Sequence, residues 1–354
     1  MSISSLQPKR LTAAKAAFTT RNVNFDVITN IIAGDVHPQV GGLVLARVDK
    51  IGKHKRLDLA TGRKAHLFVG DEIIVVYGSR YAPDQFETDT PFDLSPCHLV
   101  AAGGLAGIAV PQHMTMNFPT RISPIGLLAD SQGRPINISD FVLSPTSYVG
   151  QRPVTVAVVG TSMNSGKTTT TAHLIKGLVN SGLKVGAAKI TGISSGNDTW
   201  LMRDAGASRV LDIIDVGFPS TYQTTSKQVE GILNSLSIHL AAEQVDVIVL
   251  EIADGLFQTE TSALISSLNF RGTVDGVFFA ANSALGAIDG LQLLQKYQIP
   301  VLAIVGAVTK SPLATHETIK ATGLPVLDLE MLCVKAADLI VSSGLGMLLD
   351  SRLM

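Results

Sequence analysis

The stretch VTVAVVGTSMNSGKTTTTA, residues 154–172, decides the fold of this chain. A run of small and β-branched apolar residues meets Gly160, and after a spacer of five residues come Gly166, Lys167 and Thr168. In the segment that follows, apolar residues are spaced for one buried helix face. A strand, a glycine-bounded loop and a helix in this order predict a phosphate-binding loop.

The residue types in this loop suit the binding of nucleotide phosphates. Backbone N–H groups of the loop and the positive N-terminus of the helix would hold a β-phosphate. Lys167 would reach the β- and γ-phosphates as a compact cation, and the Thr168 hydroxyl would ligate Mg²⁺. We therefore expect the nucleotide-binding residues to be Gly160, Thr161, Asn164, Ser165, Gly166, Lys167, Thr168 and Thr169.

The spacing of the motif departs from the usual G-x-x-x-x-G-K-[ST] pattern. Counted from Gly160 the spacer is one residue longer, and Thr161 takes the place of the usual first glycine. The alternative interpretation is an ordinary strand–turn–helix with a surface lysine. The Gly-Lys-Thr triplet between a strand and a helix favours the phosphate-binding loop over that alternative.

The bulk composition narrows the classes of protein to consider. The 354 residues predict two domains, and a formal net charge of -1 gives no basic field for a nucleic-acid partner. Two cysteines far apart in the sequence do not form a disulfide framework, which favours a reducing compartment. The sequence contains no apolar run long enough to cross a bilayer. We expect a cytoplasmic protein with neither nucleic-acid nor membrane partners.

Residues 1–150 are predicted to form a small β-rich, barrel-like domain with a helical or frayed N-terminus. Many short strand candidates with glycine turns are typical of a barrel or sandwich. The strand candidates are residues 43–48, 56–60, 64–68, 73–78, 98–102, 107–110, 125–129 and 136–142. Residues 79–96 are polar and contain several prolines, which predicts a surface loop that contacts a substrate or partner.

Residues 151–354 are predicted to form a parallel-sheet P-loop NTPase domain of the α/β class. Pro145, Gly150 and Pro153 mark a linker before it. Strand and helix patterns then alternate, which indicates a parallel sheet with helices on both faces. Residues 326–329 are predicted as the last strand and residues 333–349 as the last helix. Thr225 and Gln228 have the spacing of a capping box at a helix start.

Three charged residues lie at or just beyond the ends of predicted strands, where parallel sheets bind ligands. Glu251 ends an apolar strand and is a candidate Mg²⁺ ligand, with a solvated strand-end charge as the alternative. Asp198 begins a predicted helix, so it is either a metal ligand or a helix cap. Lys189 either extends to the surface or neutralises charge on a transferring phosphoryl group or an anionic substrate.

Two stretches, GTSMNSGKTTT and GNDTWLMRDAGA, resemble the accessory GTP-binding proteins of molybdopterin-guanine-dinucleotide synthesis over residues 154–207. Dethiobiotin synthetase is similar over a longer span, which includes a strand ending in Glu251 and the segment SALGAI. The resemblance implies a P-loop protein of that branch. It also implies Mg²⁺ ligation by Thr168, Asp198 and Glu251, and contact of Lys189 with substrate or the phosphoryl group.

The chain departs from these families at several positions. No N-K-x-D motif for guanine is present, since Thr309, Lys310, Ser311 and Pro312 keep only the lysine, so ATP is expected rather than GTP. The β-rich first domain matches neither family. A looser similarity connects the chain with P-loop proteins that have an extra amino-terminal domain, some of which N-acetylate D-glutamate.

We interpret the sequence as that of a Mg-ATP-binding P-loop enzyme. The expected reaction is ATP-dependent ligation or phosphoryl transfer to a small carboxylate- or carbamate-bearing substrate, with Lys167 and Lys189 as catalytic residues. One alternative is a nucleotide-dependent accessory protein that binds a partner enzyme in cofactor biosynthesis. A further alternative is an N-acyltransferase on a P-loop scaffold. A homodimer is left open.

Overall fold

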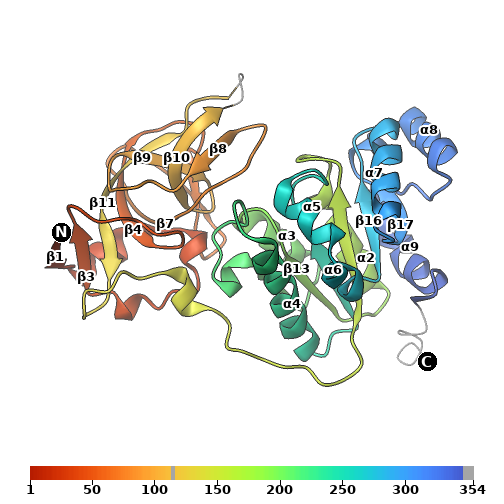
Figure 1. Ribbon diagram of the computed structural model, residues 1–354, viewed down its shortest axis with the longest axis horizontal. Helices are drawn as coiled ribbons and strands as arrows, with labels where there is room; N and C mark the ends of the chain where they lie inside the picture. Colours follow the sequence, from red (N-terminus) through yellow and green to blue (C-terminus); the bar gives the residue numbers. More distant parts are fainter. Residues whose placement is uncertain (113–115, 346–354) are drawn as a thin grey trace. The chain divides into compact units, whose positions relative to one another are not determined.

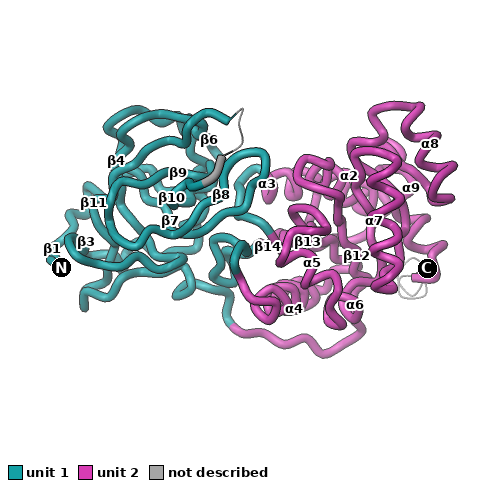
Figure 2. Tube along the Cα trace, turned by 45° about the horizontal axis from the view of Figure 1, so that its top comes forward, with its two compact units in different colours: residues 1–144, 192–197, 213–223 teal, residues 145–191, 198–212, 224–354 magenta. Residues whose placement is uncertain are grey.

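The computed structural model describes residues 1–112 and 116–345 (Figure 1). The chain forms two compact units, coloured in Figure 2. Unit 1 comprises Met1–Ser144, Gly192–Asn197 and Ile213–Gln223, and unit 2 comprises Pro145–Thr191, Asp198–Asp212 and Thr224–Met354. The division at residues 150 and 151 stays a prediction. Two short segments that it assigns to the second domain, 192–197 and 213–223, group with unit 1.

Unit 1 contains a closed ring of five strands, so the barrel-like expectation for this region is confirmed. In order around the ring, these strands are β4 (Leu43–Lys50), β7 (Glu72–Tyr77), β10 (Leu105–Gln112), β9 (Cys97–Ala101) and β11 (Thr120–Ala129). The β11 strand pairs with both β9 and β4, which closes the ring. The β7–β10 pair is parallel, and the other four pairs are antiparallel.

Shorter elements surround this barrel. The other strands of unit 1 are β1 (Ser2–Ser5), β2 (Lys15–Ala16), β3 (Asn30–Ala33), β5 (Arg56–Asp58), β6 (Lys64–His66) and β8 (Phe86–Asp89). Its helical turns are α1 (Pro8–Ala13), η1 (Phe18–Thr20), η2 (Phe25–Val27), η3 (Ile138–Phe141) and η4 (Ile213–Val216). The predicted loop at 79–96 therefore contains a strand, β8, which pairs with β10.

The predicted strand at residues 136–142 is wrong, because this segment forms the 3₁₀ turn η3. Asn137 and Asp140 make a reciprocal capping box at its start. The Asn137 side chain accepts a hydrogen bond from the backbone of Ser139 at 3.0 Å, and Asp140 accepts one from the Asn137 backbone at 3.0 Å. Local side-chain hydrogen bonds of this kind compete with strand pairing, and here they prevail over the β-branched composition.

Both faces of the barrel strands are buried, which explains why β7 reads as a continuous apolar run. Val75 and Tyr77 belong to one hydrophobic cluster, whereas Ile74 and Val76 belong to another. Side chains alternate between the two faces of a strand, so each face packs against its own cluster. The second cluster also contains Ile214, which lies in the sequence between two segments of unit 2, residues 198–212 and 224–354.

Unit 2 contains a six-stranded sheet in which every pair of neighbours is parallel, as the sequence predicts. Across the sheet the order is β14-β13-β15-β12-β16-β17. The strand bounds are β12 (Val154–Gly160), β13 (Val185–Lys189), β14 (Arg209–Asp212), β15 (Val247–Glu251), β16 (Gly276–Ala280) and β17 (Val301–Val305). The predicted strand at 326–329 is wrong, since this segment makes only a single bridge to Ile304.

Helices separate the strands of this sheet. They are α2 (Lys167–Asn180), α3 (Gly196–Asp204), α4 (Ser226–Ala242), α5 (Thr259–Ser266), α6 (Leu268–Thr273), α7 (Ala284–Lys296), η5 (Ala307–Lys310), α8 (Pro312–Thr322) and α9 (Leu329–Ser342). The capping box of Thr225 and Gln228 at the start of α4 is confirmed. The last helix was expected over residues 333–349, and this prediction is wrong at both ends, because α9 begins at Leu329 and ends at Ser342. Residues 346–349 lie outside the described part of the chain.

The α2 and α9 helices pack on the same face of this sheet. Val156 and Val158 of β12 share a buried cluster with Leu174 of α2 and Leu332 of α9.

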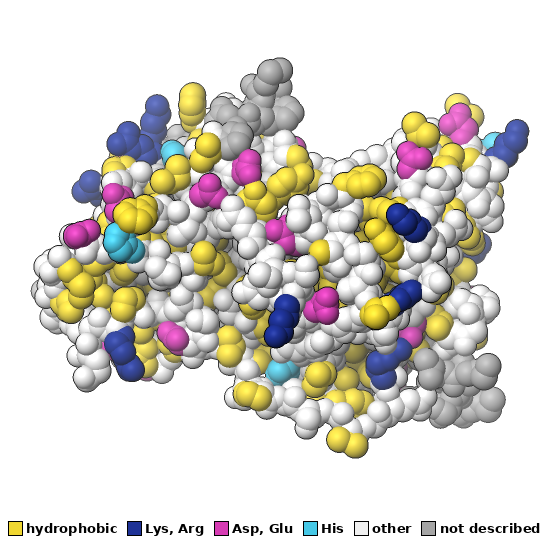
Figure 3. Space-filling view, in the orientation of Figure 1, with side chains coloured by type: hydrophobic (Ala, Val, Ile, Leu, Met, Phe, Trp, Pro, Cys, Tyr) yellow, Lys and Arg dark blue, Asp and Glu magenta, His cyan; other side chains and the backbone are white. Residues whose placement is uncertain are grey.

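On the face of the molecule that Figure 3 shows, Lys and Arg side chains lie among Asp and Glu side chains on both units. Within residues 1–112 and 116–345, no helix is both long and apolar enough to cross a membrane.

Candidate nucleotide-binding site

The register of the parallel sheet brings the predicted charged residues to one edge. Glu251 at the end of β15 pairs with Val158 of β12 on one side and with Lys189 of β13 on the other. Since β12 leads directly into residues 160–168, which we call the phosphate loop, Lys189 and Glu251 end beside that loop. Both residues are buried, since Lys189 as a whole residue is 5% exposed and Glu251 2% exposed.

Close backbone approaches explain the glycines of the phosphate loop. A Cβ on Gly160 would lie 2.4 Å from the Ser165 Oγ, so only glycine lets the loop fold back on the strand end. Gly166 has a φ of 97°, in the left-handed region that glycine adopts without strain. A Cβ on Gly306, in the loop after β17, would lie 2.3 Å from the Ser165 carbonyl oxygen. The loop is therefore fixed from both sides.

The start of α2 is left open to an anion. Gly166 is its N-cap residue and provides no side-chain hydrogen bond, so the first N–H groups of the helix keep their donor capacity. Three hydroxyl oxygens in and next to the loop are buried with no hydrogen-bond partner among residues 1–112 and 116–345, namely those of Thr161, Ser165 and Thr170. These groups match the oxygens of a bound phosphate.

Lys167 lies folded across the phosphate loop. Its ammonium donates a hydrogen bond to the Ser162 carbonyl at 2.7 Å, and the Asn282 side-chain amide donates to the Ser162 hydroxyl at 2.9 Å. Burial lowers the pKa of Lys167, and the negative charges of Glu251 and Asp254 oppose that effect. A phosphate that enters the loop would replace the Ser162 carbonyl as the partner of this ammonium.

Thr168 and Glu251 form a pair with the chemistry of a magnesium site. The Thr168 hydroxyl donates to Glu251 Oε1 at 2.7 Å, while Glu251 Oε2 is buried and has no hydrogen-bond partner in the described part of the chain. Burial raises the pKa of Glu251, and the charge of Lys189 opposes the rise. An orphaned carboxylate oxygen beside a hydroxyl suits Mg²⁺, which usually takes one or two protein oxygens and completes its shell with phosphate and water.

The remaining ligands of such an ion would come from outside the protein. Within the described ranges, no three His, Cys, Asp or Glu side chains gather as a metal site. Thr168 and Glu251 therefore fit a magnesium ion that arrives with the nucleotide rather than one held by the protein alone.

Lys189 and Asp198 form a buried ion pair, with side-chain exposures of 7% and 15%. Burial by itself lowers the pKa of Lys189, but the charges of Asp198 and Glu251 outweigh burial and raise it. Lys189 is thus a buried cation and not an exposed strand-end lysine. Asp198 lies in the first turn of α3, and the ion pair adds a role that sequence reasoning did not weigh.

The other predicted contacts are less enclosed. Asn164 and Thr169 are exposed, and Asn164 adopts a left-handed φ of 63° that helps the loop turn.

Sequence reasoning assigned no role to Asp254, which is 9% exposed. Its negative charge acts to raise the pKa of both Lys167 and Lys189. A second acid shortly after a strand-end carboxylate, in EIADG, is the signal that could have found it.

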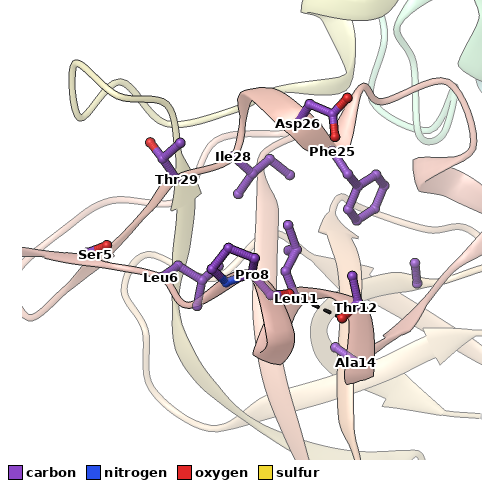
Figure 4. Close-up of a pocket in the computed structure, with 11 residues that line it drawn as sticks. Ser5, Leu6, Pro8, Leu11, Thr12, Ala14, Phe25, Asp26, Ile28 and Thr29 are labelled. Atoms are coloured by element: carbon purple, nitrogen blue, oxygen red, sulfur yellow. Dashed lines mark hydrogen bonds between the residues drawn. The ribbon is translucent and has the colours of Figure 1, made fainter.

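Unit 1 has a cavity of its own, of about 580 Å³ (Figure 4). Leu6, Leu11, Phe25 and Ile28 make most of its wall apolar, and the Thr12 hydroxyl donates to the Pro8 carbonyl at 3.2 Å. The residues predicted to bind nucleotide or metal do not line it.

The sequence of the site region matches a known family. Residues 155–261 match the family described as Molybdopterin guanine dinucleotide synthesis protein B. The match covers less than a third of the chain. It includes β12, the phosphate loop, Lys189, Asp198 and Glu251. With the strand–loop–helix geometry, it defines this region as a nucleotide-binding P-loop NTPase domain. No curated protein matches the sequence.

Solved structures of P-loop proteins resemble part of the chain. Signal recognition particle 54 kDa protein from Aeropyrum pernix in complex with GDP is 18% identical to this chain. The match covers 58% of this chain and 50% of that protein, with a TM-score of 0.36. A DUF1611 family protein from Anabaena variabilis is 15% identical, with coverages of 56% and 61% and a TM-score of 0.39. Hydrogenase maturation factor HypB from Archaeoglobus fulgidus is also 15% identical, with coverages of 56% and 91% and a TM-score of 0.37. The chain thus spans about half the length of the first of these proteins.

Proposed function

We propose that this protein binds Mg-ATP and transfers its γ-phosphoryl group to a small carboxylate- or carbamate-bearing substrate, as a ligase or phosphotransferase does. The observation that carries the proposal is the second buried cation, Lys189, in register with Glu251 beside the phosphate loop. Two buried ammonium groups and a magnesium ion would offset the charge of a transferring phosphoryl group. Catalysis would then consist mostly of positioning and charge.

Each residue of the site would have a separate role in this reaction. Lys167 exchanges the Ser162 carbonyl for phosphate oxygens, and the uncapped start of α2 donates N–H groups to the same phosphates. Thr168 and Glu251 would hold a magnesium ion, which would supply charge neutralisation at the phosphate oxygens. Asp198 holds Lys189 in place, and in the magnesium-bound protein it would be a further ligand of the ion or of its water.

The preference for ATP rests on the segment after β17. Ala307 donates its backbone N–H to the Ser165 carbonyl at 2.9 Å, so this segment lies against the phosphate loop. The position of the guanine-binding aspartate is occupied by Pro312, the first residue of α8. Proline has neither a carboxylate nor a backbone N–H, so the donors of a guanine edge would lack an acceptor there.

A screen of phosphoryl acceptors tests the proposal. The full-length protein is incubated with Mg-ATP and small molecules that carry a carboxylate or a carbamate, and products are followed by phosphorus NMR. We expect ADP to form together with a phosphorylated or ligated product of one acceptor class. Tight Mg-ATP binding with no turnover for any acceptor, and turnover that begins only when a partner protein is added, would contradict the proposal.

A second candidate function is favoured by the family match over residues 155–261. We propose as the alternative a nucleotide-dependent accessory protein that binds a partner enzyme in cofactor biosynthesis. Its hydrolysis alone would be slow, and the partner would raise the rate. The acceptor screen separates the two candidates, because an accessory protein gives only ADP and inorganic phosphate.

A further inference from the structure

The cavity of unit 1 lies within the second hydrophobic cluster of that unit. Leu6, Leu11 and Ile28 of its wall are buried members of this cluster, whereas Ala14 and Phe25 pack against it and are only partly buried. Protein interiors hold few voids larger than a water molecule, so a hollow of about 580 Å³ here is not ordinary packing. Its volume is in the range of small-molecule sites, about 300–1,000 Å³.

Hydrogen bonds within unit 1 hold the walls of the cavity in place. The Leu6 N–H donates to the Thr29 carbonyl at 2.8 Å, just before α1 begins. Arg10 of α1 donates to both carboxylate oxygens of Glu72 in β7, at 2.9 and 2.6 Å. The Asn24 side chain caps η2 by accepting a backbone hydrogen bond at 3.0 Å. The cavity is therefore preformed, which lowers the cost of binding a ligand there.

The polar side chains of the cavity provide one negative charge and three hydroxyl groups. Among the described residues that line it, Asp26 carries the only charge, and Ser5, Thr12 and Thr29 carry the hydroxyls. The Thr12 hydroxyl donates its proton to the Pro8 carbonyl at 3.2 Å, so its oxygen is left as an acceptor. The lining thus has acceptors for a ligand that donates hydrogen bonds, and it has no cation for an anionic ligand.

The cations of the neighbouring elements are paired elsewhere. Arg10 pairs with Glu72, and Lys15 pairs with Asp71. Asp26 is exposed, and within residues 1–112 and 116–345 its side chain forms no hydrogen bond or ion pair. A negative charge at an apolar cavity favours a ligand with a positive charge and disfavours an anion.

Phe25 adds an aromatic surface next to this carboxylate. Figure 4 shows the Phe25 ring extending from η2 into the cavity, with the Asp26 carboxylate at the upper end. The face of an aromatic ring attracts a cation within about 6 Å of its centre. An ammonium group at this end of the cavity is therefore attracted by both side chains, while the rest of the wall suits an apolar group.

We propose that this cavity binds a small primary amine with an apolar body, of the arylalkylamine class. Its ammonium group donates to the Asp26 carboxylate and contacts the face of the Phe25 ring. Its body lies against Leu6 and Leu11 and displaces water from them. A molecule of about ten non-hydrogen atoms fits a volume equal to about twenty water molecules. The proposal is independent of the proposed function, because the residues predicted to bind nucleotide or metal do not line this cavity.

Titration of the full-length protein with phenethylamine, followed by calorimetry, tests the proposal. Phenethyl alcohol and hydrocinnamate are the matched ligands, since they replace the ammonium group by a neutral hydroxyl and by a carboxylate. We expect a Kd for the amine below about 1 mM. The alcohol should bind about fivefold more weakly, which is the range for an exposed charge, and the anion more weakly still.

Three variants locate the ligand. Asp26→Asn removes the charge and keeps the size of the side chain, so the amine should lose affinity about fivefold while the alcohol changes less than twofold. Asp35→Asn, at another exposed acid of unit 1 that does not line the cavity, is the matched control and should leave both affinities unchanged. Ala14→Phe fills the cavity and should weaken both ligands at least about tenfold.

Several outcomes would overturn the inference. These are an amine Kd above about 1 mM, equal affinities for the amine and hydrocinnamate, and an unchanged preference for the amine over the alcohol in Asp26→Asn. Full amine binding by Ala14→Phe would place the ligand elsewhere and would overturn it too. If Ala14→Phe does not fold, Asp26→Asn and Asp35→Asn still decide the question, because both substitutions are at exposed positions.

Discussion

The loops that follow β13 and β15 begin at the same edge of one sheet, but they belong to different units of the molecule. Each strand ends in a charged residue, Lys189 or Glu251, and each loop is followed or occupied by an acid, Asp198 or Asp254. The β15 loop stays in unit 2. Most of the β13 loop, residues 192–197, belongs to unit 1.

The two loops are held in comparable ways by different parts of the chain. In unit 1, the Thr221 hydroxyl accepts from Gly192 at 2.8 Å, and Arg21 donates to the Ser194 hydroxyl at 3.2 Å. A Cβ on Gly103 would lie 2.4 Å from the Ser194 carbonyl oxygen. In the same way, a Cβ on Gly255 in the β15 loop would lie 2.6 Å from the Thr161 carbonyl oxygen of the phosphate loop. A strand-end position therefore predicts which residues begin near the phosphates, but the packing of each loop decides what it can reach.

The largest effect should come from the strand-end acid of the β15 loop. Glu251→Gln keeps the hydrogen bond from Thr168 but removes the charge that would hold magnesium. We expect Mg²⁺-dependent turnover to fall about 10³-fold, measured as kcat against Mg²⁺ concentration. Glu243→Gln, at an exposed position after α4, is the control. An unchanged Mg²⁺ dependence would show that the orphaned carboxylate oxygen has another purpose.

The second-largest effect on turnover should come from Lys189, the lysine at the end of β13. Lys189→Ala removes a buried cation that we assign to the transition state, so kcat should fall about 10²-fold while nucleotide affinity changes much less. Steady-state kinetics and thermal-shift titration with Mg-ATP give the two quantities. Lys184→Ala, just before the same strand at an exposed position, is the matched control. Equal losses in affinity and kcat would make Lys189 a binding residue only.

Asp198 should show a smaller effect, because its first partner is a lysine. Asp198→Asn is expected to weaken Mg²⁺ affinity about 10-fold, the range for a residue that positions a metal ligand. Titration of turnover with Mg²⁺ measures it. If only the Tm changes, Asp198 is a helix cap and an ion-pair partner, and the metal assignment fails.

The smallest effect on nucleotide chemistry is expected from the unit 1 side of the β13 loop. Arg21 pairs with Asp215 at 3.0 Å, with side-chain exposures of 15% and 11%. Arg21→Ala should destabilise unit 1 by about 2 kcal/mol, because the buried Asp215 carboxylate loses its cation while it keeps the hydrogen bond from the Asn22 amide. Nucleotide affinity should stay within threefold. Chemical denaturation and thermal-shift titration separate the two, and a large loss of affinity would mean that unit 1 controls the site.

The sequence was most informative where chemistry depends on local order. A strand, a glycine-bounded loop and a lysine at a helix start are contiguous, and the ends of parallel strands meet at one edge whatever their separation in sequence. Lys189 and Glu251 were therefore predicted to lie near the phosphate loop, and their register places them there. Asp254 received no role from the sequence, because its left-handed backbone and its burial are not revealed by periodicity.

The parts that could not be predicted depend on distant partners. The short strands of residues 1–150 indicated a barrel, but not which five strands close it or that β7 and β10 pair in parallel. Ile214 reads as the end of a strand in unit 2, yet it is buried in a cluster of unit 1. Nothing in its local pattern distinguishes these two environments, since both are apolar.

The split composition of unit 1 has a consequence for synthesis on the ribosome. The barrel strands are complete by Ala129, but the last segment of unit 1 ends at Gln223, about 80 residues after Ser144. At ordinary rates of translation this is a delay of about 4–16 s. Through that interval the nascent unit 1 lacks Ile214 and the rest of residues 213–223, while the residues of β12, β13 and β14 are synthesised. Unit 1 therefore acquires the last residues of its second hydrophobic cluster only after part of unit 2 has been synthesised, and during this interval the exposed cluster is where we would test for chaperone binding.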